Sequence, residues 1–339
     1  MLAQLEAIVG ELENGASRHD LLRLLPPGGA RNAADAALWD LEAQLAGTSA
    51  WELAGVKPEP VHTVFTIGLE DEPEQMAAGA AAATDVTLLK IKLNNDRPVE
   101  RIAAIRKARP DVRLVVDVNQ GWSFAELRDY GPAIGELGVE FIEQPLPRGA
   151  DEELEGYASP VPLCADESCL HLGELEQAVG RYQIINIKLD KTGGLTEALR
   201  LGERARALDL GVMVGCMVGS SLAMAPAMLV AQGADYVDLD APLLLAEDRA
   251  RYALEEAVDL QHPPAVDGQI QHLTGLQAVV ESIAQTPHQV VAVDEAADEI
   301  EGLSTVVTLQ LLGAIAEITI ELLVERRVEQ KRIGTFLVA

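Results

Sequence analysis

The stretch TLLKIKLNN at residues 87–95 places two lysines, Lys90 and Lys92, two positions apart in an otherwise apolar run. In a β-strand, residues i and i+2 point to the same face of the sheet. Both lysines are therefore expected to project to one face, close to where the strand ends. Buried charges are costly unless they are paired or bound to a metal, so partners for these lysines are expected nearby.

Similar short, apolar and β-branched runs recur on both sides of this stretch. The eight runs are HTVFTIGL (62–69), LLKIKL (88–93), RLVVDVN (113–119), VEFIEQP (139–145), PLCADES (162–168), IINIKLD (184–190), GVMVGCM (211–217) and YVDLD (236–240). Helical patterns lie between most of them, for example at 98–108 and 124–137. Eight strands alternating with helices predict a closed parallel barrel of the (β/α) type. An open doubly wound sheet is the competing fold, and it is disfavoured because no GxGxxG follows the first strand.

The ends of these predicted strands carry most of the chemistry-bearing side chains. In parallel barrels, active sites lie at the carboxyl ends of the strands. The residues there are Lys90, Lys92, Asp117, Asn119, Glu143, Asp166, Glu167, Lys188, Asp238 and Asp240. A barrel selected for packing alone does not need so many ionisable groups, so the barrel mouth is the predicted site.

Three carboxylates, Asp117, Glu143 and Asp166, come from three successive strands. Because neighbouring strands lie about 4.8 Å apart, these side chains are expected to converge on a space that fits one cation. Oxygen ligands of this kind favour Mg²⁺, with Mn²⁺ as a substitute. Each residue alone would be read as a helix cap or a salt-bridge partner, and the prediction depends on the triplet.

Lys92 and Lys188 flank the triplet from two different strands. They could serve only as counter-charges for the carboxylates. As catalytic groups they would be two opposed bases, because amines crowded near Mg²⁺ and one another lose pKa and can accept protons near neutrality. Two bases on opposite faces of a carbon atom permit removal of a proton from one side and its return from the other. That chemistry inverts a stereocentre.

The motifs KIK, DVN, EQP, ADES, NIKLDKTGG and GCMVGSS resemble those of the enolase superfamily, in its muconate-lactonizing-enzyme-like branch. Within that branch, VDLDAPLLL (237–245) resembles the dipeptide epimerases. The resemblance implies a Mg²⁺-dependent epimerase of L-Ala-D/L-Glu or a similar dipeptide, working by 1,1-proton transfer through a metal-stabilised enediolate.

The resemblance also assigns the site residues. It implies Asp117, Glu143 and Asp166 as metal ligands and Lys92 and Lys188 as the acid/base pair. The substrate-binding residues that it implies are Asn119, Lys90, which would support the substrate carboxylate, and Asp238 and Asp240, which would hold the free α-ammonium of the dipeptide.

Three other functions fit part of this pattern. A related cycloisomerase or N-acylamino acid racemase would keep the metal and the lysines but has no free ammonium to bind. An impaired, metal-binding barrel would keep the ligands without proton exchange. A Schiff-base aldolase would use a barrel lysine as a nucleophile, and the carboxylate triplet argues against it.

The pattern predicts three parts in the chain: cap helices at 1–58, the barrel at 59–250, and a barrel end with an unusual extension at 251–339. Members of the resembled family normally start with a cap sheet, which is missing here before the first helices. Alternation in the extension, as in EITIEL (317–322), predicts strands that could form a replacement cap sheet. A separate small domain, or a helical or poorly ordered tail, are the alternatives.

The amino-acid composition excludes some classes of binding partner. With 54 acidic and 26 basic residues, the net charge of −28 has the wrong sign for binding nucleic acid or anionic membranes. The N-terminus lacks the basic region of a secretory signal, and the longest apolar stretch (309–324) is interrupted by two glutamates. The three cysteines form no CxxC pattern and are expected to be reduced thiols. A cytoplasmic enzyme with a small-molecule dipeptide substrate is predicted, and a homo-oligomer is compatible with the sequence.

Overall fold

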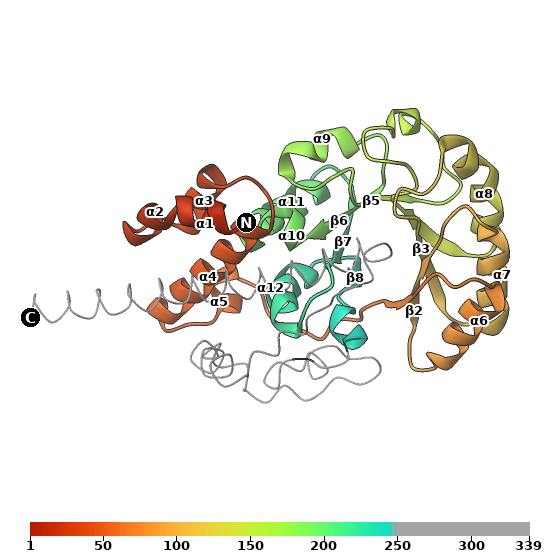
Figure 1. The fold of residues 1–339 in the computed structure, drawn as a ribbon, viewed down its shortest axis with the longest axis horizontal. Helices are drawn as coiled ribbons and strands as arrows, with labels where there is room; N and C mark the ends of the chain where they lie inside the picture. The colour runs from red at the N-terminus through yellow and green to blue at the C-terminus, as the bar shows by residue number, and fades with distance from the viewer. Residues whose placement is uncertain (246–247, 249–339) are drawn as a thin grey trace, which may run out of the picture. The chain divides into compact units, whose positions relative to one another are not determined.

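Eight parallel strands form one sheet, in which each strand pairs with the next one along the chain (Figure 1). The strands are β1 (Phe65–Ile67), β2 (Leu88–Lys92), β3 (Arg113–Asp117), β4 (Val139–Glu143), β5 (Leu163–Ala165), β6 (Ile184–Lys188), β7 (Gly211–Gly215) and β8 (Tyr236–Asp238). Each lies within one of the eight apolar runs. The predicted parallel barrel strands are therefore confirmed, in the predicted order.

Hydrogen bonds also connect the last strand to the first. The backbone amide of Val64, just before β1, donates to the carbonyl oxygen of Val237 in β8 at 2.8 Å. The amide of Leu239 donates to Oγ1 of Thr63 at 2.9 Å, and the amide of Thr66 donates to Oδ2 of Asp240 at 2.8 Å. One backbone bond and two bonds to side chains thus join the last strand to the first, and the sheet forms a nearly closed barrel.

The computed structural model describes residues 1–245 and 248. Within these, Met1–Lys57 belong to one compact unit and the residues from Pro58 onward to another. The helices between the strands of the second unit are α6 (Pro73–Ala82), α7 (Pro98–Ala108), α8 (Phe124–Glu136), α9 (Leu175–Ala178), α10 (Leu189–Thr192), α11 (Leu195–Arg206) and α12 (Ser221–Ala231), with short 3-10 helices η1 (Glu152–Leu154), η2 (Leu172–Glu174) and η3 (Ala241–Leu244). The predicted extension at 251–339 and its cap sheet lie outside the described residues, and the three-part division stays a prediction.

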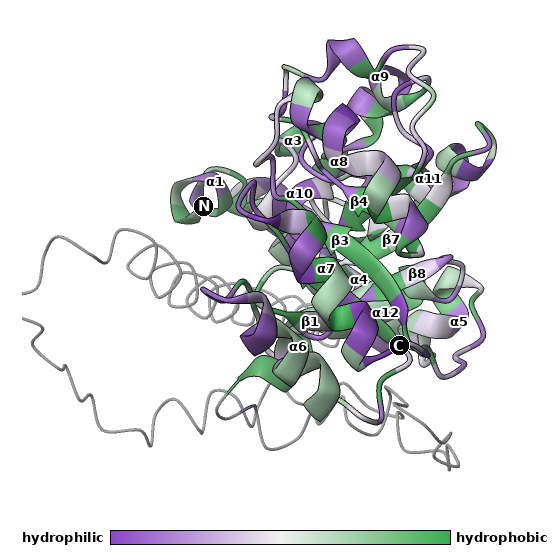
Figure 2. Ribbon diagram, turned by 90° about the vertical axis from the view of Figure 1, so that its right-hand side faces the viewer, coloured by the Kyte–Doolittle hydropathy of each residue, from purple (hydrophilic) through white to green (hydrophobic). Residues whose placement is uncertain are grey.

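One layer of apolar side chains fills the lower interior of the barrel. It contains Val64, Leu88, Val115, Phe141, Cys164, Ile184 and Met213, all buried, with Tyr236 packed against them. Each of the eight strands, or the residue just before it, supplies one member, as expected where alternate residues point inward. In Figure 2 strand β3 is mostly coloured as hydrophobic, because its outward-facing residues are buried too.

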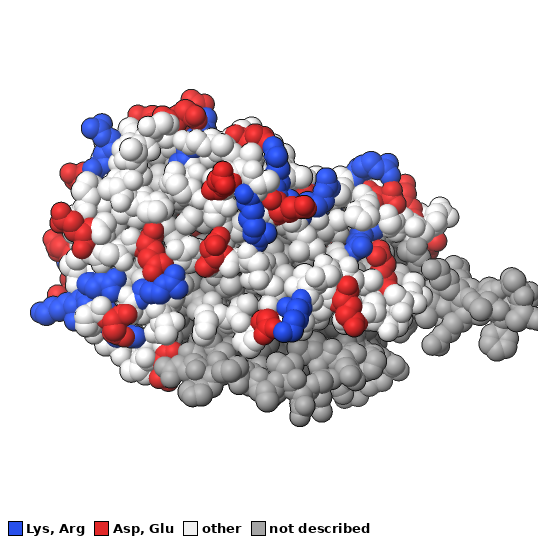
Figure 3. All heavy atoms as spheres, turned by 180° about the vertical axis from the view of Figure 1, so that it is seen from behind, with Lys and Arg blue, Asp and Glu red and all other residues white. Residues whose placement is uncertain are grey.

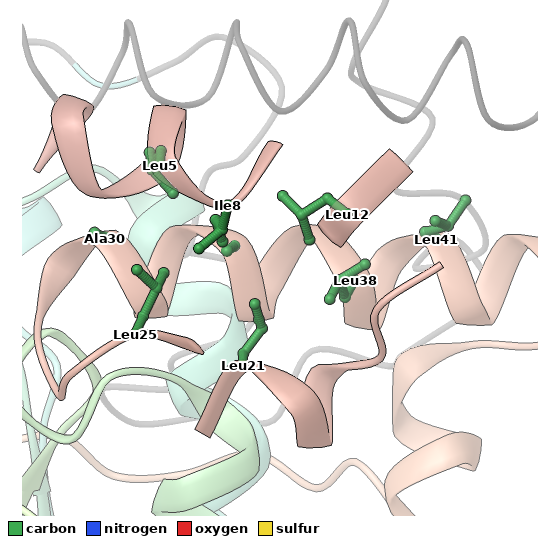
Figure 4. Close-up of a cluster of buried hydrophobic side chains, with 9 residues drawn as sticks. Leu5, Ile8, Leu12, Leu21, Leu25, Ala30, Leu38 and Leu41 are labelled. Atoms are coloured by element: carbon green, nitrogen blue, oxygen red, sulfur yellow. The ribbon is translucent and has the colours of Figure 1, made fainter. Parts of the chain in front are cut away.

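The first unit is helical, with α1 (Leu2–Ala7), α2 (Val9–Glu13), α3 (Arg18–Leu24), α4 (Gly29–Ala46) and α5 (Ala50–Ala54). The predicted cap helices at 1–58 are thus present, and the first helical stretch is interrupted at Ile8, which separates α1 from α2. Ser17 and Ser49 cap α3 and α5 in capping boxes. Figure 4 shows how the leucines of these helices meet in a cluster of their own. Among the described residues of this unit there is no strand, so no N-terminal cap sheet is present in that part of the chain.

On the face drawn in Figure 3, acidic and basic side chains are interspersed. That face therefore offers no continuous basic patch of the kind that binds nucleic acid. No helix in the part of the chain described here is long and apolar enough to cross a membrane.

Candidate active site

A second, polar layer lies directly above the apolar layer of the barrel. Two residues beyond each apolar member, at the next inward position of the same strand, stand Thr66, Lys90, Asp117, Glu143, Asp166, Asn186, Gly215 and Asp238. The register of the strands keeps some of these positions level: Thr66 pairs with Lys90, Asp117 with Glu143, and Gly215 with Asp238. From β2 to β3 the pairing is offset by two residues, so that Lys92, and not Lys90, pairs with Asp117. The same period of two that predicts the strands thus places the ionisable residues at the mouth.

Lys90 lies at the centre of this polar layer. Its Nζ is 2.7 Å from Oδ2 of Asp238, 2.7 Å from Oε2 of Glu143 and 3.1 Å from Oδ2 of Asp117, and only 3% of its side chain is exposed. Burial lowers the pKa of Lys90, but the three negative charges outweigh it and raise the pKa well above its ordinary value. Lys90 is therefore a fixed cation that neutralises carboxylates from three strands.

Lys92, two residues further on, is more accessible, with 33% of its side chain exposed. Its Nζ donates to Oδ2 of Asp117 at 2.7 Å and to Oδ1 of Asn119 at 3.0 Å. Asn119 adopts a left-handed backbone conformation (φ 46°), in which its amide donates to Oδ1 of Asp117. The predicted residues Lys92, Asp117 and Asn119 thus form one hydrogen-bonded group at the ends of β2 and β3.

Asp166, just past β5, is held between two lysines. Lys188 Nζ donates to its Oδ2 at 2.7 Å, and Lys191 Nζ donates to its Oδ1 at 2.5 Å. Burial lowers the pKa of Lys188, but the charges of Asp166 and Glu143 outweigh it and raise the pKa above its ordinary value. The expectation that crowded lysines lose pKa refers to amines near bound Mg²⁺, and it stays a prediction. In this arrangement the nearest charges to Lys188 are carboxylates, not other cations.

Glu143 is fully buried, and its side chain carries the oxygen atom best suited to bind a cation. Asn186 Nδ2 donates to its Oε1 at 2.7 Å. Its Oε2 lies in the ion pair with Lys90 but accepts no hydrogen bond among the described residues. Burial, together with the negative charge of Asp117, raises the pKa of Glu143 to about 7. A buried carboxylate oxygen that contacts an ammonium group and lies next to two further carboxylates fits the hard-oxygen chemistry of Mg²⁺.

The three carboxylates are nevertheless arranged as ion pairs and not as a cation cage. Within residues 1–245 and 248, no group of three or more His, Cys, Asp or Glu side chains lies close enough together to hold a metal ion. The lysines account for this, because their ammonium groups draw the oxygens of Asp117 and Asp166 toward themselves. A cation at this place would have to replace lysine contacts on these carboxylates.

Asp238 and Asp240, at the end of β8, already have partners. Asp238 accepts a hydrogen bond from Lys90 at 2.7 Å, and Asp240 accepts one from the amide of Thr66. Burial, with the negative charge of Asp238, raises the pKa of Asp240 to about 6. A positive group bound beside Asp240 would relieve this unfavourable burial of charge.

Three residues of the polar layer were not singled out from the sequence: Thr66, Asn186 and Gly215. Lys191, which lies outside that layer and contacts Asp166, was not singled out either. Asn186 is two residues before Lys188 on β6, so strand alternation could have placed it at the mouth. Lys191 belongs to the one-turn helix α10, and its contact with Asp166 depends on how the chain turns after β6. Gly215 is at the end of β7, where a Cβ atom would lie 2.6 Å from Oδ1 of Asn186 and 3.0 Å from Cε of Lys188.

Fold and site together define a parallel (β/α) barrel whose mouth concentrates lysines and carboxylates from most of its strands. Residues 74–276 match the family model described as "Enolase C-terminal domain-like". The match covers more than half of the chain. The chain therefore belongs to the enolase superfamily, as its motifs predicted.

Two relatives are 44–45% identical to this chain over the aligned residues. N-acetyl-D-glutamate racemase from Pseudoalteromonas sp is 45% identical over 233 residues, which are 69% of this chain and 74% of the relative. L-Ala-D/L-Glu epimerase from Escherichia coli (strain K12) is 44% identical over 251 residues, which are 73% of this chain and 78% of the relative.

Solved structures are also similar to this chain. An enolase family member from Agrobacterium tumefaciens with homology to dipeptide epimerases, crystallised with sodium and L-Ala-L-Glu, is 46% identical, with a TM-score of 0.69; the match covers 73% of this chain and 76% of that one. A dipeptide epimerase from Enterococcus faecalis V583, complexed with Mg and L-Leu-L-Tyr, is 28% identical, with a TM-score of 0.67 and coverage of 73% and 75%. Relatives of this chain thus bind Mg²⁺ and dipeptides.

The close approach at Gly215 gives a testable prediction. In Gly215→Ala the new methyl group would meet Asn186 and Lys188, and we expect the free energy of unfolding to fall by about 1–3 kcal/mol, as for other overpacked sites. Gly202→Ala in α11 is the matched control, because its Cβ would make only ordinary contacts of 3.5–3.6 Å. It should raise helix stability by about 0.5–1 kcal/mol. Urea unfolding of both variants measures this, and equal effects would contradict the proposed crowding.

Proposed function

We propose that this chain is a dipeptide epimerase that inverts the α-carbon of the C-terminal residue of L-Ala-D/L-Glu or a similar dipeptide. The observation that carries the proposal is the placement of two lysines, Lys92 at the end of β2 and Lys188 at the end of β6. In a closed ring of eight strands in sequential order, β2 and β6 are four strands apart in either direction, and so lie on opposite sides. This placement supports two bases that address opposite faces of one carbon atom.

The two lysines have reciprocal tasks in this reaction. One lysine, as a neutral amine, takes the α-proton and becomes an ammonium, while the other, as an ammonium, donates a proton to the opposite face. For the reverse reaction the roles exchange. Each lysine is paired with a carboxylate at 2.7 Å, Lys92 with Asp117 and Lys188 with Asp166. Each can act as a base only when its carboxylate is drawn elsewhere and its ammonium group has lost a proton.

Asp117, Glu143 and Asp166 are the residues that would hold Mg²⁺, and when bound it would stabilise the negative charge that develops on the substrate carboxylate. If bound Mg²⁺ drew Asp117 and Asp166 away from Lys92 and Lys188, the two amines would be free to reach the substrate. Lys90 stays buried between Glu143 and Asp238, where it supplies a fixed positive charge beside the substrate carboxylate. Asn119 orients Lys92 through its side-chain oxygen.

Asp238 and Asp240 would recognise the free α-ammonium of the dipeptide. Asp240 is the better candidate for direct contact, because Asp238 is already paired with Lys90, whereas burial keeps the pKa of Asp240 raised. A substrate ammonium would supply the missing positive charge.

We also infer a cytoplasmic setting from Cys164, Cys169 and Cys216, all of which are free thiols.

A racemase of N-acylated glutamate is the second candidate, favoured by the 45% identity to N-acetyl-D-glutamate racemase. Such a substrate has the same α-carbon and carboxylates but no α-ammonium. The lysines and the three carboxylates would act in the same way on either substrate. The two candidates differ only in what the end of β8 must bind.

The two-lysine mechanism is tested by proton NMR of L-Ala-L-Glu and L-Ala-D-Glu in D₂O with Mg²⁺. The wild-type protein should exchange the glutamate α-proton of both diastereomers and interconvert them, and removal of Mg²⁺ with EDTA should stop both processes. We expect Lys92→Met and Lys188→Met each to lower epimerisation by about 10²–10⁴-fold. Each variant should keep exchange with only one diastereomer, because one base remains.

Lys107→Met, on the exposed face of α7, is the control and should behave as the wild type. Epimerisation by Lys92→Met or Lys188→Met within threefold of the wild type would rule out that lysine as a base. Exchange of both diastereomers in both single variants would rule out the assignment of one face to each lysine.

Replacement of Asp240 distinguishes the two candidate substrates. Asp240→Asn removes the charge but keeps an acceptor for the Thr66 amide. If the dipeptide is the substrate, KM for L-Ala-L-Glu should rise at least tenfold, about the effect of one lost charge-assisted hydrogen bond. The rate with N-acetyl-L-glutamate should change little. Asp129→Asn, at an exposed position of α8, is the control. An unchanged KM for the dipeptide, with faster turnover of N-acetylglutamate in the wild type, would favour the racemase.

A further inference from the structure

Gln144 follows Glu143 directly and is fully buried in a left-handed backbone conformation (φ 38°). Such a conformation is uncommon for residues other than glycine and needs support from its surroundings. The backbone on both sides supplies it: the amide of Gln144 donates to the carbonyl of Cys164, and its carbonyl accepts from the amide of Gln120, both at 2.8 Å. The residue therefore joins the segments that follow β3 and β4 to β5.

The side-chain carbonyl of Gln144 holds the segment that carries Asp166. Its Oε1 accepts hydrogen bonds from the backbone amides of Asp166 at 2.9 Å and Ser168 at 3.0 Å. Strand β5 ends at Ala165, and its pairing with β4 and β6 does not extend to Asp166. Beyond the end of the ladder, the position of the Asp166 backbone thus depends on this side chain.

The side-chain amide of Gln144 is fixed from the other direction. Its Nε2 donates to the carbonyl of Leu146 and to Oγ of Ser168, both at 2.8 Å, and lies 3.4 Å from the hydroxyl of Tyr182. That hydroxyl donates to Oδ2 of Asp151 at 2.8 Å. With both ends of the amide bonded, the orientation of Gln144 is determined, and its carbonyl faces Asp166.

We propose that Gln144 is a positioning residue that sets the spacing between Glu143 and Asp166, and thereby the affinity of the barrel mouth for a divalent cation. The inference rests on the proposed function, in which these carboxylates hold Mg²⁺. Gln144 does not touch the cation or the substrate. It acts because one rigid side chain connects the end of β4, where Glu143 stands, to the backbone of Asp166 on the next strand.

An amide is the side chain that this position requires. Two backbone N–H groups need an acceptor, while the carbonyl of Leu146 needs a donor, and a glutamine side chain presents one of each. Leucine has a similar size but leaves these buried groups without partners. Residues that orient metal ligands typically change metal affinity by about 10–100-fold when they are replaced.

The test is a titration of the full chain with Mn²⁺, followed by the EPR signal of the free ion, which needs no substrate. We expect Gln144→Leu to lower the affinity for Mn²⁺ at least tenfold. Gln183→Leu is the matched control, because the side-chain carbonyl of Gln183 also accepts from an amide of β5, that of Leu163 at 2.9 Å, but at the other end of the strand. It should leave the affinity within twofold. Thermal unfolding without metal reports whether each variant folds.

Equal affinities of Gln144→Leu and the wild type would overturn the positioning role alone, since Mn²⁺ would still bind. An equal loss in Gln183→Leu would also overturn it, because the effect would then be a general loosening of β5. If the wild type binds no Mn²⁺, the proposed metal-dependent function fails, and this inference fails with it. Should Gln144→Leu not fold, Gln144→Asn replaces it with the same expectation, since it keeps a buried amide but shortens its reach.

Discussion

The barrel mouth depends on one buried ammonium group, that of Lys90, which lies within 2.7–3.1 Å of carboxylates from β3, β4 and β8. Without it, Asp117, Glu143 and Asp238 would share a space of low dielectric with insufficient positive charge, which is strongly unfavourable. Lys90 therefore makes it possible to bury these three carboxylates close to one another. Lys92 and Lys188, paired with Asp117 and Asp166, are the lysines whose contacts can be exchanged during a reaction.

Much of this arrangement could be predicted from the sequence because a strand has a period of two. Once Leu88 is placed in the barrel interior, Lys90 and Lys92 must follow on the same side, and the same reasoning leads from Phe141 to Glu143. The apolar runs also gave the order of the eight strands. The family followed from motifs at the strand ends, since these residues carry the chemistry.

Pairings between side chains could not be predicted in this way. That Asp166 lies between Lys188 and Lys191 was not indicated by the sequence, because the position of Lys191 depends on the turn after β6. The raised pKa of Lys188 follows from the same contact. Gln144 was part of a recognised motif, but its role depends on a left-handed backbone and on hydrogen bonds to a neighbouring strand, which no local pattern indicates.

The most direct measurement is the free energy of unfolding of Lys90→Met without metal, by urea titration at neutral pH, compared with Lys92→Met. Lys90→Met leaves buried carboxylates without their cation, and the account predicts a loss of about 3–5 kcal/mol. Lys92 is partly exposed, so Lys92→Met should cost less than about 1 kcal/mol. Equal stability of Lys90→Met and the wild type would contradict the account, because the carboxylates would then not need this lysine.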